Sequence, residues 1–172
     1  MKVVVGIGGS VAAYKACILV RRLVRAGSEV RCVLTENGAK MVSATALAAL
    51  SRNPVLTDLF DSGQWEMAHL SLASWAERVV VAPASADLLS RLAAGRAGGP
   101  VECVVLSTKA PVFVAPAMDT DMWSHPATQA NVERLRAFGC RILGPTEGEL
   151  ASGRIGMGRL LEPEEIARAV LA

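Results

Sequence analysis

The sequence predicts an α/β fold in which a parallel sheet carries helices on both faces. Three observations support this class. The chain opens with a strand, a glycine turn, a helix and a second strand, which is the order of a parallel βαβ unit. Apolar segments typical of buried strands then alternate with segments of helical periodicity. Finally, 52% of the 172 residues are hydrophobic, which suits strands that are covered on both faces.

The opening unit is the clearest part of the pattern. A β-branched run over Lys2–Ile7 predicts the first, central strand, and Gly8–Ser10 predicts the turn after it. Apolar residues at helical spacing predict a helix over Val11–Arg25, which ends with basic residues in its last turn and Gly27 just beyond. The apolar segment Glu29–Leu34 predicts the second strand.

The remaining elements follow from the same periodicities and from glycine and proline breaks. Strands are predicted over Arg78–Ala82, Val112–Ala115 and Arg141–Leu143, and Val55–Phe60 is a short apolar segment. Helices are predicted over Ala39–Leu50, Ser71–Ala76, Ala84–Ala94, Val101–Ser107, Pro126–Phe138 and Pro163–Leu171. A turn is predicted at Asp61–Gly63, and Gly144–Gly158 is interpreted as a long loop. We expect one domain over residues 1–172, without an internal repeat or a linker.

Composition narrows the classes of partner. The net charge is +2 and the basic residues are scattered, so nothing favours nucleic acid or an anionic membrane. No apolar run reaches the roughly 18 residues that a membrane span needs. We therefore expect a cytoplasmic protein. The cysteines are far apart in apolar segments and lack a C-x-x-C spacing, which favours reduced thiols over disulfides or a metal site. They are Cys17, Cys32, Cys103 and Cys140.

Several polar motifs follow predicted strands, and the carboxyl ends of parallel strands meet at one edge of a sheet. Gly8–Ser10 could let the backbone approach a phosphate, or could simply be a tight turn. Thr35 suits a phosphate and Glu36 suits a ribose, so the type of nucleotide stays open. Ser85 could cap a helix or line a polyol chain. We expect these motifs to share one site.

Three further features are candidates for chemistry. The segment Pro116–Trp123 places a methionine, two carboxylates and an indole directly after a strand. His69 lies among apolar residues, so it is either a structural histidine or a catalytic one. His125 is interpreted as a helix cap or a surface residue. The glycine-rich segment Leu150–Arg159 is either a surface loop or a mobile lid that brings a guanidinium to a substrate carboxylate.

Four of these motifs together resemble a known family. They are GSVAAYK at residues 9–15, PASAD at 83–87, PAMDTDMW at 116–123 and the loop at 151–159. They occur in the order seen in the homo-oligomeric flavin-containing cysteine decarboxylases. That family includes phosphopantothenoylcysteine decarboxylases and peptidyl-cysteine decarboxylases.

The resemblance implies a Rossmann-like (flavodoxin-like) domain that binds FMN near subunit contacts in a trimer or an assembly of trimers such as a dodecamer. FMN would oxidise a cysteine thiol to a thioaldehyde, so that CO2 leaves and an enethiol remains. By resemblance, His69 and Asp119 are catalytic. FMN contacts are expected from Gly9, Ser10, Thr35, Ser85, Ser107 and Met118, and substrate contacts from Asp119, Met122, Ser152 and Arg154.

Two departures from the family pattern bear on the substrate. Asp119 stands where the family usually has an asparagine that binds the substrate carboxylate, so the aspartate must be protonated or re-paired, for example with Arg154. Ser152 stands where the phosphopantothenoylcysteine enzymes have a cysteine that helps return the enethiol to a saturated thiol. Peptidyl-cysteine decarboxylases lack that cysteine and stop at the enethiol.

The sequence therefore favours oxidative decarboxylation of a C-terminal peptide cysteine to an aminoenethiol. The alternative is decarboxylation of phosphopantothenoylcysteine, which the first helix and Pro83–Asp87 favour. A third possibility is a non-catalytic FMN-binding regulatory subunit, which Asp119 favours and an intact His69 disfavours.

Overall fold

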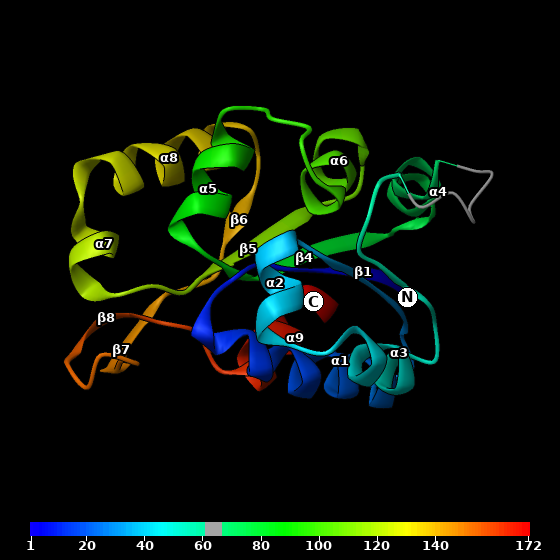
Figure 1. Cartoon of the computed structure of the whole chain (residues 1–172), viewed down its shortest axis with the longest axis horizontal. Coiled ribbons are helices and arrows are strands. Elements are labelled where there is room, and N and C mark those ends of the chain that lie inside the picture. The colour runs from blue at the N-terminus through cyan, green and yellow to red at the C-terminus, as the bar shows by residue number, and fades with distance from the viewer. Residues whose placement is uncertain (61–66) are drawn as a thin grey trace.

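A six-stranded parallel sheet forms the centre of the molecule, as the computed structural model shows for residues 1–60 and 67–172 (Figure 1). The strand order is β3-β2-β1-β4-β5-β6, so the predicted α/β class is confirmed. The turn predicted at Asp61–Gly63 lies outside the described residues. The strands are β1 (Lys2–Ile7), β2 (Glu29–Leu34), β3 (Val55–Leu56), β4 (Arg78–Ala84), β5 (Val112–Pro116) and β6 (Arg141–Ile142).

Helices cover both faces of this sheet (Figure 1). One face is covered by α1 (Lys15–Arg25), α3 (Ala44–Ser51) and α9 (Pro163–Leu171), with a 3₁₀ turn at Val11–Tyr14 before α1. The other face is covered by α4 (Ala68–Trp75), α5 (Ala86–Ala93), α6 (Pro100–Ser107) and α8 (Pro126–Ala137). Two short helices, α2 (Glu36–Met41) and α7 (Thr120–Ser124), begin where β2 and β5 lead out of the sheet. Within the described ranges, no helix is long and apolar enough to cross a lipid bilayer.

Alternate residues of β1 enter the two halves of the core. Val3 and Ile7 pack into the cluster under α1 and α9, and Val4 packs into the cluster on the opposite face. Each of these side chains is at most 1% exposed. A strand buried on both faces has no reason to alternate with polar residues, which explains the continuous apolar run in the sequence.

The helix predicted over Ala39–Leu50 is wrong, because two helices occupy this stretch. Val42 is extended between them, with φ −141° and ψ 142°. The Ser43 hydroxyl then accepts a hydrogen bond from the Ala46 amide and starts α3. A serine that caps the next helix competes with continuation of the previous one.

The loop predicted over Gly144–Gly158 is also wrong. It contains an antiparallel hairpin of β7 (Thr146–Glu149) and β8 (Ile155–Arg159). The sequence also gave no indication of α7, or that Val55–Leu56 pairs with β2 as an edge strand. The hairpin lies beside α7 at one end of the molecule (Figure 1).

Because Phe113 is buried, we expect it to contribute more to stability than the exposed Phe138. Phe113 is 1% exposed on β5, whereas Phe138 after α8 is 63% exposed. We expect Phe113→Ala to lower the free energy of unfolding by about 3–5 kcal/mol, because it leaves a cavity in the core. Phe138→Ala is the matched control and should change it by less than ~1 kcal/mol. Denaturant unfolding checks both, and equal losses would contradict this picture of the core.

Candidate functional site

A cavity of about 490 Å³ opens at the carboxyl edge of the sheet. The 3₁₀ turn, the segment after β5 and the hairpin form its walls, as the parallel topology predicts for ligand sites. Its lining residues are Ser10, Val11, Ala12, Tyr14, Lys15, Ala117, Met118, Asp119, Glu149, Leu150, Ala151, Ser152, Gly158, Arg159 and Leu160. Four residues predicted from the sequence, Ser10, Met118, Asp119 and Ser152, therefore share one cavity.

The turn after β1 is packed tightly against its neighbours. The Gly8 amide donates to the Pro83 carbonyl oxygen at 2.9 Å, which ties β1 to β4. A Cβ on Gly9 would lie 2.4 Å from the Cβ of Asn37, so only glycine fits there. The Ser10 oxygen accepts from the Ala12 amide at 3.3 Å, which leaves the hydroxyl proton free to donate. An anion can therefore contact this turn through its backbone and through the Ser10 hydroxyl.

Asp119 is the centre of a polar cluster at the tip of the hairpin. The Ser152 hydroxyl donates to Asp119 Oδ2 at 2.7 Å. Arg154 Nη1 lies 3.3 Å from Asp119 Oδ1 and 2.6 Å from Asp121 Oδ2, and its Nη2 lies 3.3 Å from Asp121 Oδ1. Asp119, Ser152 and Arg154, predicted to act together, therefore lie in contact.

These contacts decide the charge of Asp119. The hydrogen bond from Ser152, followed by the backbone amide of Asp121, lowers the pKa of the Asp119 carboxyl below its ordinary value, and Arg154 adds to this. Hydrogen bonds to the charged form of an acid favour ionisation. Asp119 is therefore ionised and re-paired at neutral pH rather than protonated.

Arg154 faces Asp121 more closely than it faces Asp119. The guanidinium also lowers the pKa of Asp121, chiefly through their hydrogen bond. Neither Arg154 nor Met122 is among the residues that line the cavity. Both are well exposed, and their predicted contact with a substrate stays a prediction.

The hairpin is fixed to the segment after β5 through backbone. The Met118 amide donates to the Gly158 carbonyl oxygen at 3.0 Å. Gly158 has φ +138°, and a Cβ there would lie 2.2 Å from the Met118 carbonyl oxygen. A residue with a side chain would push the two segments apart.

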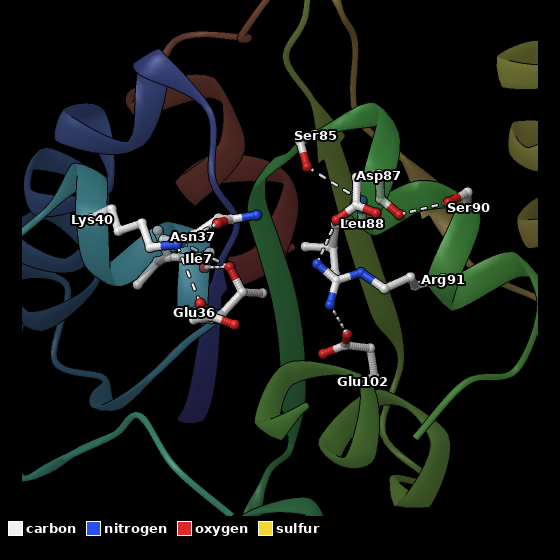
Figure 2. A network of polar contacts seen from close by, with 12 residues as sticks. Ile7, Glu36, Asn37, Lys40, Ser85, Asp87, Leu88, Ser90, Arg91 and Glu102 are labelled. Atoms are coloured by element: carbon white, nitrogen blue, oxygen red, sulfur yellow. Dashed lines mark hydrogen bonds and ion pairs between the residues drawn. The ribbon is translucent and has the colours of Figure 1, made fainter. Parts of the chain in front are cut away.

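Figure 2 shows the edge of the sheet between α2 and α5. The Ser85 oxygen accepts a hydrogen bond from the Leu88 amide at 3.3 Å. Ser85 therefore caps α5, which is one of the two roles that the sequence suggested for it. Arg91 donates to Asp87 Oδ2 at 2.5 Å and to Glu102 Oε1 at 2.7 Å. The Glu102 side chain is fully buried, and its Oε2 has no hydrogen-bond partner among the described residues.

This ion pair was not expected from the sequence. Glu102 lies in an apolar run, eleven positions after Arg91 in the chain. The pair fixes α5, which carries Ser85 and Asp87 at its start, against α6. Neither Arg91 nor Glu102 lines the cavity.

Thr35 is already engaged by the protein. Its hydroxyl accepts from the Gly38 amide at 2.9 Å and donates to the Ile7 carbonyl oxygen at 3.3 Å. Its amide also donates to Ile7. Thr35 is 2% exposed, so its predicted FMN contact would have to displace one of these bonds.

His69 and Ser107 do not join the cavity. His69 lies in α4, which Figure 1 places at the opposite end of the long axis from α7 and the hairpin. Ser107 is the last residue of α6, which leads toward the start of β5 and hence toward the amino edge. His125 caps α8, because its Nδ1 accepts from the Ala127 amide at 3.1 Å. No group of three or more side chains suited to a metal occurs in the described part of the chain.

The fold and the cavity are those of an α/β ligand-binding domain, and comparison with known proteins identifies the class. The profile of the Flavoprotein family matches residues 1–172, so the chain belongs to this family. Its structural neighbours include flavin-containing cysteine decarboxylases, which confirms the resemblance seen in the four motifs.

Several curated relatives bear the name coenzyme A biosynthesis bifunctional protein CoaBC. That of Mycolicibacterium smegmatis is 47% identical over 165 residues, covering 96% of this chain and 40% of the relative. That of Haemophilus influenzae is 43% identical over 169 residues, covering 98% of this chain and 42% of the relative. The chain thus spans about two fifths of the length of these relatives.

Solved structures agree on the fold. A PPC decarboxylase mutant, C175S, in complex with pantothenoylaminoethenethiol has a TM-score of 0.88 at 31% identity, covering 99% of this chain and 96% of the other. The FMN-dependent cysteine decarboxylase SpaF has a TM-score of 0.86 at 28% identity, covering 99% and 95%. The peptidyl-cysteine decarboxylase EpiD, at 20% identity and a TM-score of 0.84, shares the fold.

The cluster at Asp119 predicts a measurable titration. We expect Ser152→Ala to raise the pKa of Asp119 toward the ordinary value of about 3.9, because the largest cause of its lowering is removed. A lowered carboxyl pKa stabilises the fold above the ordinary pKa, and this contribution is lost as the pH falls through the lowered value. Carboxyl ¹³C NMR of labelled protein measures the shift.

The control for this titration is Ser124→Ala. The Ser124 hydroxyl donates to the backbone carbonyl of Asp121 rather than to a carboxylate. The pKa of Asp119 should therefore stay unchanged in this variant. An unchanged pKa in Ser152→Ala would show that the Ser152 hydrogen bond does not hold the Asp119 charge.

Proposed function

We propose that the chain, together with FMN, decarboxylates the cysteine of phosphopantothenoylcysteine. The observation that carries this proposal is the 47% identity to CoaBC over 96% of the chain. The structure of a PPC decarboxylase mutant also matches this chain with a TM-score of 0.88 at 31% identity. These comparisons favour the alternative from the sequence over peptide decarboxylation, which they support only at the level of the family.

The residues at the edge of the sheet fit FMN. Gly9 lets the turn after β1 pack directly against Asn37, and the Ser10 hydroxyl proton is free to donate to a phosphate oxygen. Ser85, with its oxygen used as a cap, keeps its own proton for a ribityl hydroxyl. Met118 lines the same cavity and supplies an apolar contact for a flavin ring. Ser107, on α6, lies outside this arrangement within one copy of the chain.

FMN supplies a two-electron oxidant that makes loss of CO2 from the cysteine possible. The chain's own groups position the reacting cysteine. Asp119 is ionised, so a substrate carboxylate beside it must be compensated, and the Ser152 hydroxyl and Arg154 are the groups that do this. Leu150 and Leu160 place apolar side chains on the wall of the cavity.

A second copy of the chain completes the site in this proposal. His69, the proposed proton-handling residue, lies on α4, far along the molecule from the hairpin (Figure 1). Val11 and Tyr14 line the cavity and are 61% and 58% exposed, an apolar surface beside a polar site. An oligomer would cover these side chains and bring His69 of one copy to the cavity of another.

Peptide decarboxylation stays as the second candidate because of Ser152. A serine hydroxyl is a far weaker acid than the thiol that phosphopantothenoylcysteine enzymes are expected to have there. An enzyme without that thiol is suited to stop at an enethiol, which is the product of a peptidyl-cysteine decarboxylase.

The substrate is tested by incubating the purified, flavin-loaded protein with phosphopantothenoylcysteine and, separately, with peptides ending in cysteine. Mass spectrometry should show loss of CO2 from phosphopantothenoylcysteine at the higher kcat/KM. Turnover of the peptides alone would establish the second candidate. A protein that binds FMN but turns over neither would establish the regulatory subunit, and one that binds no FMN would overturn the whole assignment.

The side chain at position 152 should influence whether the product is the saturated thiol or the enethiol. We expect Ser152→Cys to increase the share of saturated thiol relative to enethiol, because a thiol with a pKa near 8.5 donates a proton far more readily than a hydroxyl. The ratio is measured by mass, since the two products differ by two hydrogens. Ser124→Cys, an exposed serine on α7, is the control and should leave the ratio unchanged. If wild type already gives only the saturated thiol, Ser152 does not limit the reaction.

A further inference from the structure

Two cations on the cavity wall share a single carboxylate. Lys15 Nζ lies 3.0 Å from Glu162 Oε1 and 3.2 Å from Glu162 Oε2. Arg159 Nη2 lies 2.6 Å from the same Oε1. Lys15 and Arg159 both line the cavity, whereas Glu162 is not among its lining residues. The group thus carries one positive charge more than its carboxylate balances.

Unused hydrogen-bond donors accompany this positive charge. An ammonium has three N–H donors and a guanidinium has five. Glu162 takes at most two donors from Lys15 and one from Arg159. This set of donors suits the several oxygens of a phosphate monoester better than a single carbonyl group.

Burial strengthens the electrostatic effect at this end of the cavity. The Lys15 side chain is only 11% exposed, so its charge is screened less than that of a surface lysine. A second ion pair between α1 and α9, Arg22 with Glu164, is 49% and 44% exposed and does not line the cavity. This pair therefore serves as a control, because it also joins the α1 and α9 regions but lies outside the cavity.

The acidic groups of the cavity lie at its other end. The Asp119 carboxylate reaches Ser152 in the tip of the hairpin, although its main chain lies beside Gly158. Glu149 pairs with Ile155 near the tip, whereas Arg159 pairs with Thr146 at the base. The four steps along the strand from Ile155 to Arg159 span about 13 Å. The cavity therefore has a cationic end and an anionic end, with Leu150 and Leu160 also on its walls.

We propose that Lys15 and Arg159 form a subsite for a phosphate monoester, with Glu162 holding both cations in place and competing with the ligand for them. The proposal rests on the proposed function and deepens it, because it names the residues that would recognise the phosphorylated end of the substrate. A peptide ending in cysteine has no such group. The same chemistry also occurs in the 5′-phosphate of FMN, so the test separates the two sources.

The test measures binding rather than turnover. Calorimetry of the flavin-loaded protein compares 4′-phosphopantothenate with pantothenate, which lacks the phosphate. We expect the phosphorylated compound to bind about tenfold more tightly. Lys15→Gln and Arg159→Gln should each remove most of that preference. Glu162→Gln should increase it, because the competing charge is lost while the side chain keeps its shape.

A second arm compares FMN with riboflavin on flavin-free protein. Loss of the FMN preference in Lys15→Gln, with the pantothenate preference unchanged, would assign the subsite to the cofactor phosphate. Arg22→Gln is the control for a lost tie between α1 and α9 and should leave both preferences unchanged.

The subsite is overturned if neither preference changes in Lys15→Gln and Arg159→Gln, or if Glu162→Gln weakens binding as the other two do. The proposed function fails separately. A protein that keeps the phosphate preference but releases no CO2 from phosphopantothenoylcysteine would overturn the activity and leave the subsite in place.

Discussion

The backbone contact between Met118 and Gly158 determines where the polar side chains of the site can lie. The Met118 amide donates to the Gly158 carbonyl, and the lack of a Cβ at Gly158 lets the two segments touch without an intervening side chain. This contact holds the base of the hairpin against the segment after β5. The tip of the hairpin then reaches the start of α7, where Ser152 meets Asp119 at 2.7 Å. The position of the hairpin therefore depends on a backbone contact. Substitution of single side chains should disturb it less than it would disturb a loop held only by side chains.

The net charge at each end of the cavity follows from a small group of ionised side chains. At the tip, Arg154 is shared between two carboxylates, so Asp119 stays ionised and the group carries one net negative charge. At the base, the imbalance has the opposite sign, because Lys15 and Arg159 share one carboxylate. A ligand with different groups at its two ends would meet opposite fields, and its orientation would be decided by electrostatics before close contacts form.

The sequence was sufficient where local signals act alone. Lys2–Ile7 has the predicted bounds because a β-branched run is stable only as a covered strand, and the meeting of Asp119 with Ser152 followed from the family motifs. The hairpin was missed because its strands contain glycines instead of an apolar alternation, so their pairing comes from tertiary contacts. The distance of His69 from the cavity, and the partner of the buried Glu102, depend on how helices pack on the sheet, which periodicity does not encode.

The pair of Arg91 and Glu102 has a consequence for how this sequence can evolve. Loss of Arg91 would leave the Glu102 carboxylate uncompensated inside the protein, at a cost of about 3–5 kcal/mol, which is a large share of the stability of a small domain. Loss of Glu102 would leave Arg91 24% exposed and still bonded to Asp87. Simultaneous replacement by apolar residues of similar volume carries no such penalty. The two single losses are therefore unequal, and descendants of this chain should lose Glu102 before Arg91 or exchange both residues together.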